Sequence, residues 1–261
     1  MNSRFTLRLD GISLTDAVPG AYITDIREEP PEMVRRILQL AGGGSRVVDE
    51  RRIRLSVTVT LALREENPVT RQTLGQQLMR WCTGTRLEMN TRPSCWLPVR
   101  CTLWPKLPSA LHWTDPLSVT FTAVEVPFWV HTDPVQMLRE GALWDKLLAV
   151  PGTAPSTPMD AVLRNEGTAT CNTVALTCNS DMLHFTSLAL APGEALRITH
   201  DATDRLQLTI RAADGTDRSA FPHRSLASSN DLWARCGDNN DISLAADAPL
   251  SALLTVYGRE L

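Results

Sequence analysis

The residues that could do chemistry are scattered along this sequence. The histidines stand apart from one another, at His112, His131, His184, His200 and His223. Only His200 has an acidic neighbour, Asp201, and the pair falls at the end of an expected strand. A catalytic histidine needs a nucleophile and an orienting carboxylate in a defined geometry, and nothing else in the local sequence supplies them. We therefore interpret His200 and Asp201 as a solvated turn.

Metal sites are not indicated either. The six cysteines are Cys82, Cys95, Cys101, Cys171, Cys178 and Cys236. Cys171 and Cys178 have the wrong spacing for a zinc knuckle, and no Cys/His pair follows them. The turn CGDNND offers Asp238 and Asp241 to calcium but lacks the ligand count of a dedicated loop. We expect core thiols, a plain turn, and no catalytic residue, metal or cofactor.

Composition narrows the class of protein. The chain has 261 residues, 43% of them hydrophobic, which suits one large domain or two of ordinary size. The net charge of -3 gives no support for nucleic acid or an anionic membrane as partner. No apolar run approaches the roughly 20 residues that span a bilayer. Residues 1–4 show no signal segment, so we expect folding in a reducing cytoplasm with free thiols.

A long hairpin is the main feature of the first half. From Ile53 to Leu63 apolar residues alternate with polar ones, which predicts a single long strand with a polar second face. Gly42, Gly43 and Gly44 lack the lysine and the context of a phosphate loop, so they predict the hairpin tip. Such a hairpin either leans on something outside its own domain or simply protrudes, and the pattern leaves both possibilities open.

The one basic cluster lies on this hairpin. Arg51, Arg52 and Arg54 stand beside Asp49 and Glu50, which indicates a solvated or inter-subunit face and not a nucleic-acid patch. The candidate subunit-interface residues are Gly42, Gly43, Gly44, Arg46, Arg52 and Arg54.

One helix and one aromatic element complete the first half. Asn67 can cap a helix that starts at Pro68, and Leu74, Leu78 and Trp81 recur at helical spacing. A last strand, from Leu117, runs into the sequence PFW at residues 127–129. Two large aromatics directly after a proline predict an element that is held in place by its surroundings.

The second half predicts a different domain. Short strands with turns at regular spacing, and no long helix, are typical of an antiparallel sandwich. Between the halves, residues 135–150 have partly helical spacing, and a proline-rich stretch follows. We therefore expect a mainly β protein with a first domain at 1–134, a linker at 135–158 and a sandwich at 159–261.

The order of these features resembles the distal tail protein family of long non-contractile-tailed bacteriophages and prophages. The resemblance spans nearly the whole chain and rests on the long hairpin, the PFW element, and loose motifs such as GEALRI and GDNNDISL. It implies a tail-tube-like first domain and a galectin-like second domain. It further implies a ring, expected to be hexameric, joining the tail tube to the tail tip or baseplate of the virion.

The resemblance also implies partners. These are the tail tube protein, the tape measure protein and the tip or receptor-binding proteins, with DNA passing through the lumen without specific binding. The helical-looking connection and the glycine-rich hairpin tip depart from what the family leads us to expect.

Two other functions are weighed against this one. A galectin-like sandwich that binds carbohydrate needs an exposed aromatic beside polar residues, and Trp233 and Tyr257 are the available candidates. A cell-wall hydrolase needs a carboxylate pair or a metal set, and the sequence shows neither. A structural protein that is not an enzyme is the interpretation we carry forward.

Overall fold

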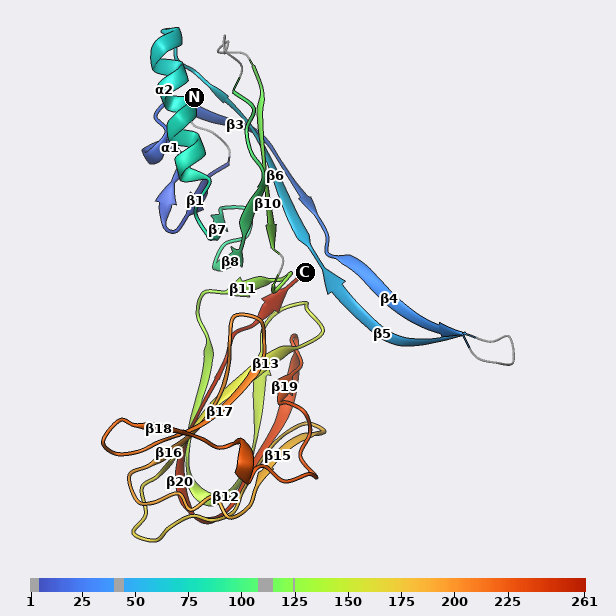
Figure 1. The fold of residues 1–261 in the computed structure, drawn as a ribbon, viewed down its shortest axis with the longest axis vertical. Coiled ribbons are helices and arrows are strands. Elements are labelled where there is room, and N and C mark those ends of the chain that lie inside the picture. Colours follow the sequence, from blue (N-terminus) through green and yellow to red (C-terminus); the bar gives the residue numbers. More distant parts are fainter. Residues whose placement is uncertain (1–4, 40–44, 108–114, 124) are drawn as a thin grey trace. The chain divides into compact units, whose positions relative to one another are not determined.

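The computed structural model describes residues 5–39, 45–107, 115–123 and 125–261 (Figure 1). The chain divides into two compact units, unit 1 with residues 1–130 and Leu261, and unit 2 with residues 131–260. Each unit surrounds an apolar core of its own. The expectation of a mainly β protein with antiparallel sheets is confirmed. Within the described ranges, no helix is long and apolar enough to cross a membrane.

Besides a separate two-stranded ribbon, unit 1 contains the antiparallel sheet β3-β6-β10-β9 and the strands β2-β1-β7-β8 of a second antiparallel sheet. The first sheet consists of β3 (Ala21–Glu29), β6 (Leu55–Leu63), β9 (Arg100–Leu103) and β10 (Leu117–Ala123). The second includes β1 (Leu7–Leu9), β2 (Ile12–Ser13), β7 (Arg86–Met89) and β8 (Cys95–Pro98). The further strand expected at residues 110–114 lies outside the described residues.

Strand β6 organises unit 1. Its apolar residues at alternate positions from Leu55 to Leu63 are all buried, as the period of two predicts. Its other face is bonded across the sheet, because the Thr58 hydroxyl lies 3.0 Å from that of Thr120. A sheet with one buried face and one hydroxyl-lined face needs a cover on the first face only.

Helix α2 (Pro68–Trp81) contributes to the core of unit 1, where the capping signal predicted a helix. The Asn67 side-chain oxygen accepts the backbone N–H of Val69 at 2.9 Å and that of Thr70 at 3.3 Å. Trp81 is buried, and its ring meets that of Phe121 edge to face at 6.1 Å. A second, one-turn helix, α1 (Leu14–Ala17), was not predicted.

The tryptophan of the PFW element is held in place by burial, as the sequence predicts. Strand β11 (Trp129–His131) begins at Trp129, which is 0% exposed and belongs to the core of unit 1. The Arg92 guanidinium lies 5.8 Å from the centre of the Trp129 ring. Phe128 is only half-buried, so most of the anchoring falls to the tryptophan.

Unit 2 is a nine-stranded antiparallel sheet that curls around its own core (Figure 1). The strand order is β15-β14-β20-β13-β16-β17-β18, while β12 pairs with β20 and β19 with β13. The strands are β12 (Val135–Val150), β13 (Thr157–Asn165), β14 (Val174–Cys178), β15 (Asp181–Phe185), β16 (Ala195–His200), β17 (Leu206–Arg211), β18 (Asp217–Ser219), β19 (Trp233–Ala234) and β20 (Asp238–Val256). A 3-10 helix, η1 (Phe221–His223), and a short strand, β21 (Arg259–Glu260), complete the unit.

Residues 135–150 have partly helical spacing in the sequence, but they do not form a helix. These residues form the strand β12, which pairs with β20 along its whole length, and the expected linker at 135–158 therefore lies largely within the sheet. Gly141 has φ of 127°, and the register shifts between Gly141 and Leu143. This bulge places leucines at spacings that imitate a helix.

Strand β20 is one long strand, although the sequence predicts short strands in this half of the chain. On one side β20 pairs with β14 as far as Ala246, and with β13 from Leu250 onward. On the other side the ladder to β12 also skips residues 246–249. Pro249 lies in this gap, where its missing N–H costs no ladder hydrogen bond. The proline marks a bend in β20, not its end.

We predict that Trp129→Ala lowers the unfolding free energy by about 3–5 kcal/mol, because it empties a fully buried indole site. Urea unfolding followed by circular dichroism measures the change. The matched control is Trp104→Ala, since Trp104 is 40% exposed. Equal stabilities for the two variants would contradict the anchoring role of Trp129.

Candidate functional site

The predicted hairpin is present as an arm of two strands, β4 (Glu32–Gln39) and β5 (Ser45–Ile53). The arm forms a separate two-stranded antiparallel sheet and projects from the β3–β6 pair (Figure 1). Its register pairs Met33 with Arg52 and Ile37 with Val47, and it shifts between Arg36 and Ile37.

The root of the arm is built by residues that interrupt β3–β6. Pro30 and Pro31 separate β3 from β4, because proline cannot donate to a ladder. On the other strand Arg54 has φ of 52°, a left-handed conformation that a non-glycine residue adopts at a cost of about 1–2 kcal/mol. The Glu32 N–H donates to the Arg54 carbonyl at 3.4 Å and closes the root. The single long strand expected from Ile53 to Leu63 is therefore broken at Arg54.

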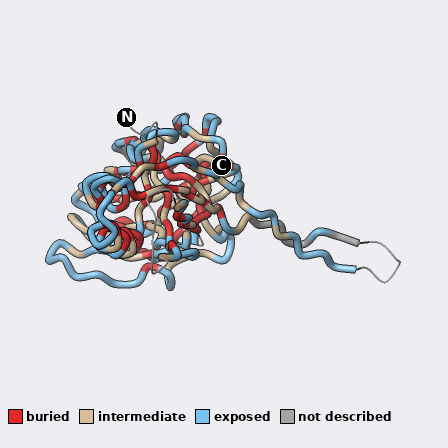
Figure 2. Tube along the Cα trace, turned by 90° about the horizontal axis from the view of Figure 1, so that it is seen from above, coloured by how far each residue is buried: buried red, intermediate tan, exposed pale blue. Residues whose placement is uncertain are grey.

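The described residues of the arm are mostly exposed or half-buried (Figure 2), and four of the exposed ones are large and apolar. Met33 is 40% exposed, Ile37 57%, Leu38 53% and Val47 47%. A two-stranded ribbon is marginally stable in water unless another layer packs on it. Exposed apolar patches with polar neighbours are typical of interaction surfaces, so the arm is the candidate functional site of unit 1.

The residues expected at a subunit interface are spread along this arm. Arg46 lies opposite Leu38 in the register, Arg52 lies opposite Met33, and Arg54 is exposed at the root. Gly42, Gly43 and Gly44 lie outside the described residues. The interface role of this set stays a prediction.

The apolar residues of the arm escaped the sequence analysis. The register skips one residue of β5 opposite the step from Arg36 to Ile37, which interrupts the alternation of β5, and the adjacent apolar residues Ile37 and Leu38 obscure the alternation of β4. The signal available in the sequence was this pair of adjacent apolar residues in a strand of the predicted hairpin.

A histidine with two carboxylate partners lies in unit 2. His200 Nδ1 lies 2.8 Å from an Asp160 oxygen, and Nε2 lies 2.6 Å from an Asp231 oxygen. The imidazole is 3% exposed and lies beside the Trp233 ring, with centroids 6.4 Å apart. The cluster ties β16 to β13 and to the segment before β19. Asp201 closes its own turn by accepting the Thr203 N–H. The solvated-turn interpretation therefore holds for Asp201 but was wrong for His200, because two distant carboxylates hold its imidazole in a buried position.

The two carboxylates set the charge of His200. Burial alone lowers the pKa of this imidazole, but the hydrogen bonds and negative charges of Asp160 and Asp231 outweigh it and raise the pKa to about 9. His200 is therefore a cation at neutral pH, with both ring nitrogens donating. A histidine in this state has no free nitrogen with which to act as a base.

The turn at CGDNND is organised by a buried asparagine. Asn240 is 0% exposed, and its side-chain nitrogen donates to the carbonyls of Leu148 and Arg235 at 3.2 and 3.1 Å. Its side-chain oxygen accepts from the Arg235 N–H at 2.7 Å. Asp238 and Asp241 are exposed and start β20 on opposite faces, because side chains alternate along a strand.

All six thiols are free, as expected for core residues. Burial raises the pKa of Cys171 and of Cys178 to about 12, so both remain protonated and unreactive near neutral pH. The acidic Asp247 beside Cys171 acts in the same direction.

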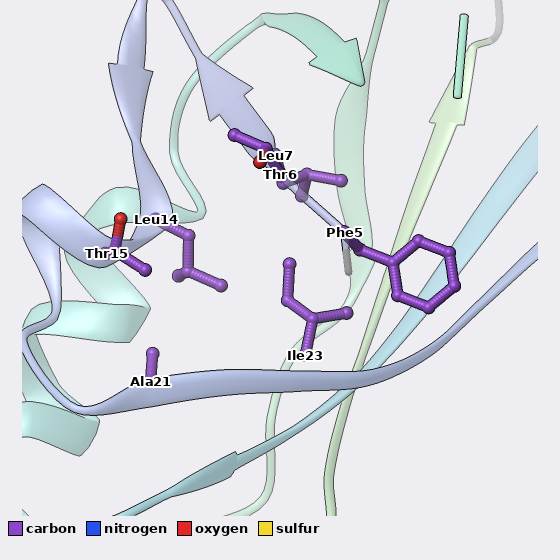
Figure 3. Close-up of a pocket in the computed structure, with 7 residues that line it drawn as sticks. All are labelled: Phe5, Thr6, Leu7, Leu14, Thr15, Ala21 and Ile23. Carbon is purple, nitrogen blue, oxygen red and sulfur yellow. The ribbon is translucent and has the colours of Figure 1, made fainter. Parts of the chain in front are cut away.

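Unit 1 contains a cavity of about 310 Å³. It is lined by Phe5, Thr6, Leu7, Leu14, Thr15, Ala21 and Ile23 (Figure 3). Among the described residues, no charged side chain lines this cavity, so this lining supplies neither an acid nor a base for catalysis.

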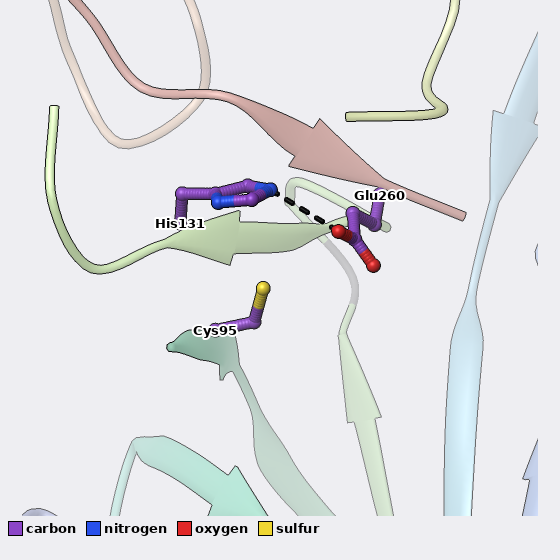
Figure 4. Close-up of side chains that lie close together, drawn as sticks. All are labelled: Cys95, His131 and Glu260. Atoms are coloured by element: carbon purple, nitrogen blue, oxygen red, sulfur yellow. Dashed lines mark ion pairs between the residues drawn. The ribbon is translucent and has the colours of Figure 1, made fainter. Parts of the chain in front are cut away.

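Two residues near the start and end of unit 2 form an ion pair. His131 Nε2 lies 3.2 Å from a Glu260 oxygen (Figure 4), and the His131 N–H donates to the Gly258 carbonyl at 2.9 Å. These contacts join the first residues of unit 2 to its last strand.

Comparison with solved structures gives an informative match. The Dit protein of phage SPP1, described as a paradigm of the hub adsorption apparatus in phages that infect Gram-positive hosts, aligns with a TM-score of 0.63 and 14% sequence identity. The alignment covers 97% of this chain and 98% of that chain. The chain has the Dit fold. No protein-family model matches it, and no curated protein matches its sequence.

A chain of the phage P2 baseplate, in its activated conformation with Ca, also aligns with this Dit fold. It covers 99% of this chain and 98% of that chain, but its TM-score of 0.46 and 11% identity are too low to support a conclusion.

The His200 cluster of this Dit fold gives a pH-dependent prediction. The pKa of His200 is raised in the folded state, so the stabilisation is fully present below about pH 6.5 and is lost as pH rises through about 9. We expect the melting temperature to fall across this window. The fall should be smaller in His200→Gln than in the control His223→Gln. Parallel profiles for the two variants would contradict the assignment.

Proposed function

We propose that the protein is a structural component of a phage tail, a Dit-like hub that joins the tail tube to the tail tip or baseplate. The full-length match to the Dit protein of phage SPP1, at a TM-score of 0.63, carries this proposal. That protein is described as part of a hub adsorption apparatus. The match spans both units, so the whole arrangement of domains along the chain supports the same function.

In this function copies of the chain close into a ring, which we propose to be hexameric. Unit 1 acts as the tail-tube-like domain and unit 2 as the galectin-like domain. The arm supports self-assembly, because its exposed apolar side chains need a cover that its own two strands do not provide. Six copies joined head to tail close without free ends when the rotation between neighbours is 60°.

The hub needs no catalysis, and the polar clusters of the described residues support that role. His200 uses both ring nitrogens in internal pairs, and Asn240 uses its amide to hold a turn. A net charge of -3 over 261 residues offers few phosphate contacts, so DNA can pass a lumen without being retained. The partners of this function are the tail tube, tape measure and tip or receptor-binding proteins.

We predict that the purified protein forms a ring. Light scattering should give a mass near six times 28.8 kDa at high concentration, and negative-stain images should show a central hole. A strict monomer that also fails to join tail tubes in a mixture would contradict the hub function.

Removing the arm should separate folding from assembly. We predict that replacing residues 32–53 by two glycines leaves the core of unit 1 folded, because Glu32 and Arg54 are hydrogen-bonded neighbours at the root. The ring should be lost, as measured by light scattering, while the far-ultraviolet circular dichroism retains a β spectrum. Rings of unchanged mass would show that the arm is not an assembly element.

A further inference from the structure

Unit 2 carries a row of exposed leucines on β12. Leu138 is 57% exposed, Leu143 79% and Leu147 63%. Their partners in the register are Leu253, Ala245 and Asp241, all odd-numbered residues of β20, whose even-numbered neighbours are buried except for the half-buried Ala246. Side chains that oppose each other in a ladder share one face. The three leucines therefore lie on the outer face of the sheet, away from the core of unit 2.

Acidic residues alternate with these leucines. The positions of β12 on the same outer face include Glu140, between Leu138 and Leu143, and Asp145, between Leu143 and Leu147. Both acidic residues are exposed. Along the outer face of β12 the side chains are therefore, in order, Leu138, Glu140, Leu143, Asp145 and Leu147. We call these five residues the leucine–acid row.

The row also lies on a sheet edge. Among the described residues β12 pairs with β20 alone, which leaves its other backbone edge without a strand along 16 residues. Long edges with apolar side chains recruit further strands unless they are covered. Leu253 of β20, 37% exposed and opposite Leu138, extends the apolar surface onto the next strand.

The arm presents the complementary pattern. Met33, Arg35 and Ile37 occupy one face of β4, and Val47 lies opposite Ile37 on that face. In the register Arg52 lies opposite Met33 and Glu50 lies opposite Arg35, so this surface combines apolar residues with two arginines and one glutamate, whereas the charges of the leucine–acid row are both acidic. Alternate residues of a strand are about 6.6–6.8 Å apart, so Met33, Arg35 and Ile37 keep step with Leu143, Asp145 and Leu147, which lie beyond the bulge of β12. Over residues 32–54 the sequence has six arginines against three acidic residues, so the arm attracts an acidic surface.

We propose that the arm of one copy of this chain docks, through the Met33–Arg35–Ile37 face, on the leucine–acid row of a second copy. The proposal rests on the self-assembly proposed above and names the surface that the arm recognises. Each copy has one arm and one row, so the contact is heterologous and repeats from copy to copy until the ring closes.

Cross-linking tests the contact directly. A benzophenone amino acid replaces Ile37 in the full-length protein, and ¹⁵N-labelled and unlabelled copies are mixed before irradiation. We expect mixed-label adducts between position 37 and residues 138–147, identified by mass spectrometry. Adducts confined to one copy would show that the arm folds back on its own chain. Adducts between copies at other residues would overturn the docking site but leave the ring intact.

Paired variants test the same contact by affinity. Leu143→Asp should weaken self-association roughly tenfold or more, since it places a charge in the apolar contact. Leu226→Asp is the matched control, because Leu226 is a fully exposed leucine of unit 2 outside the row. Glu140→Arg combined with Asp145→Arg should also weaken association, whereas Glu166→Arg should not. Equal association of the row variants and their controls would overturn the proposal.

A mixture distinguishes this proposal from the function on which it rests. Ile37→Asp removes the arm contact and Leu143→Asp removes the row contact, so an equimolar mixture retains one intact interface per pair of copies. We expect light scattering to show two-copy complexes in the mixture and monomers in each variant alone. If the wild type forms rings and both variants do too, the docking site is wrong and the hub function stands. If the wild type forms neither rings nor cross-links, both are wrong.

Discussion

A two-stranded ribbon has only its own two faces, so the apolar side chains of the arm remain in water unless another surface covers them. The rest of unit 1 holds this ribbon in place. The buried residues of β6, from Leu55 to Leu63, anchor one end of the ribbon in the core, and the break at Arg54 directs the other end outward. A left-handed arginine at the root is a local cost that the packing of β6 offsets.

Polar side chains that could take part in catalysis or binding form hydrogen bonds within the protein instead. His200 donates to two carboxylates, Asn240 donates to two carbonyls, and the Arg259 guanidinium forms two hydrogen bonds with Asp204, at 2.6 and 2.7 Å. Buried polar groups with satisfied partners specify a single packing of the core. Each of these clusters holds two or three segments of unit 2 together, which is a structural role.

The sequence predicted what depends on neighbouring residues and missed what depends on distant ones. The alternation of β6 and the cap at Asn67 are local signals, and both were read correctly. Strand β12 resembled a helix because its bulge at Gly141 is defined only by its pairing with β20. The partners of His200 lie 40 and 31 residues away, so no local pattern could connect them.

The same distinction explains why the partly helical spacing of the expected linker was misleading. Leu138, Leu143 and Leu147 have spacings of five and four residues, and a helix would have placed much of this set toward a core. Paired as a strand, they face outward while Met137 and Leu148 fill the core of unit 2. Apolar residues that the core does not use cost solubility in a monomer. They lie on an edge that no other described strand pairs with, and acidic residues alternate with them, which supports the docking surface proposed above.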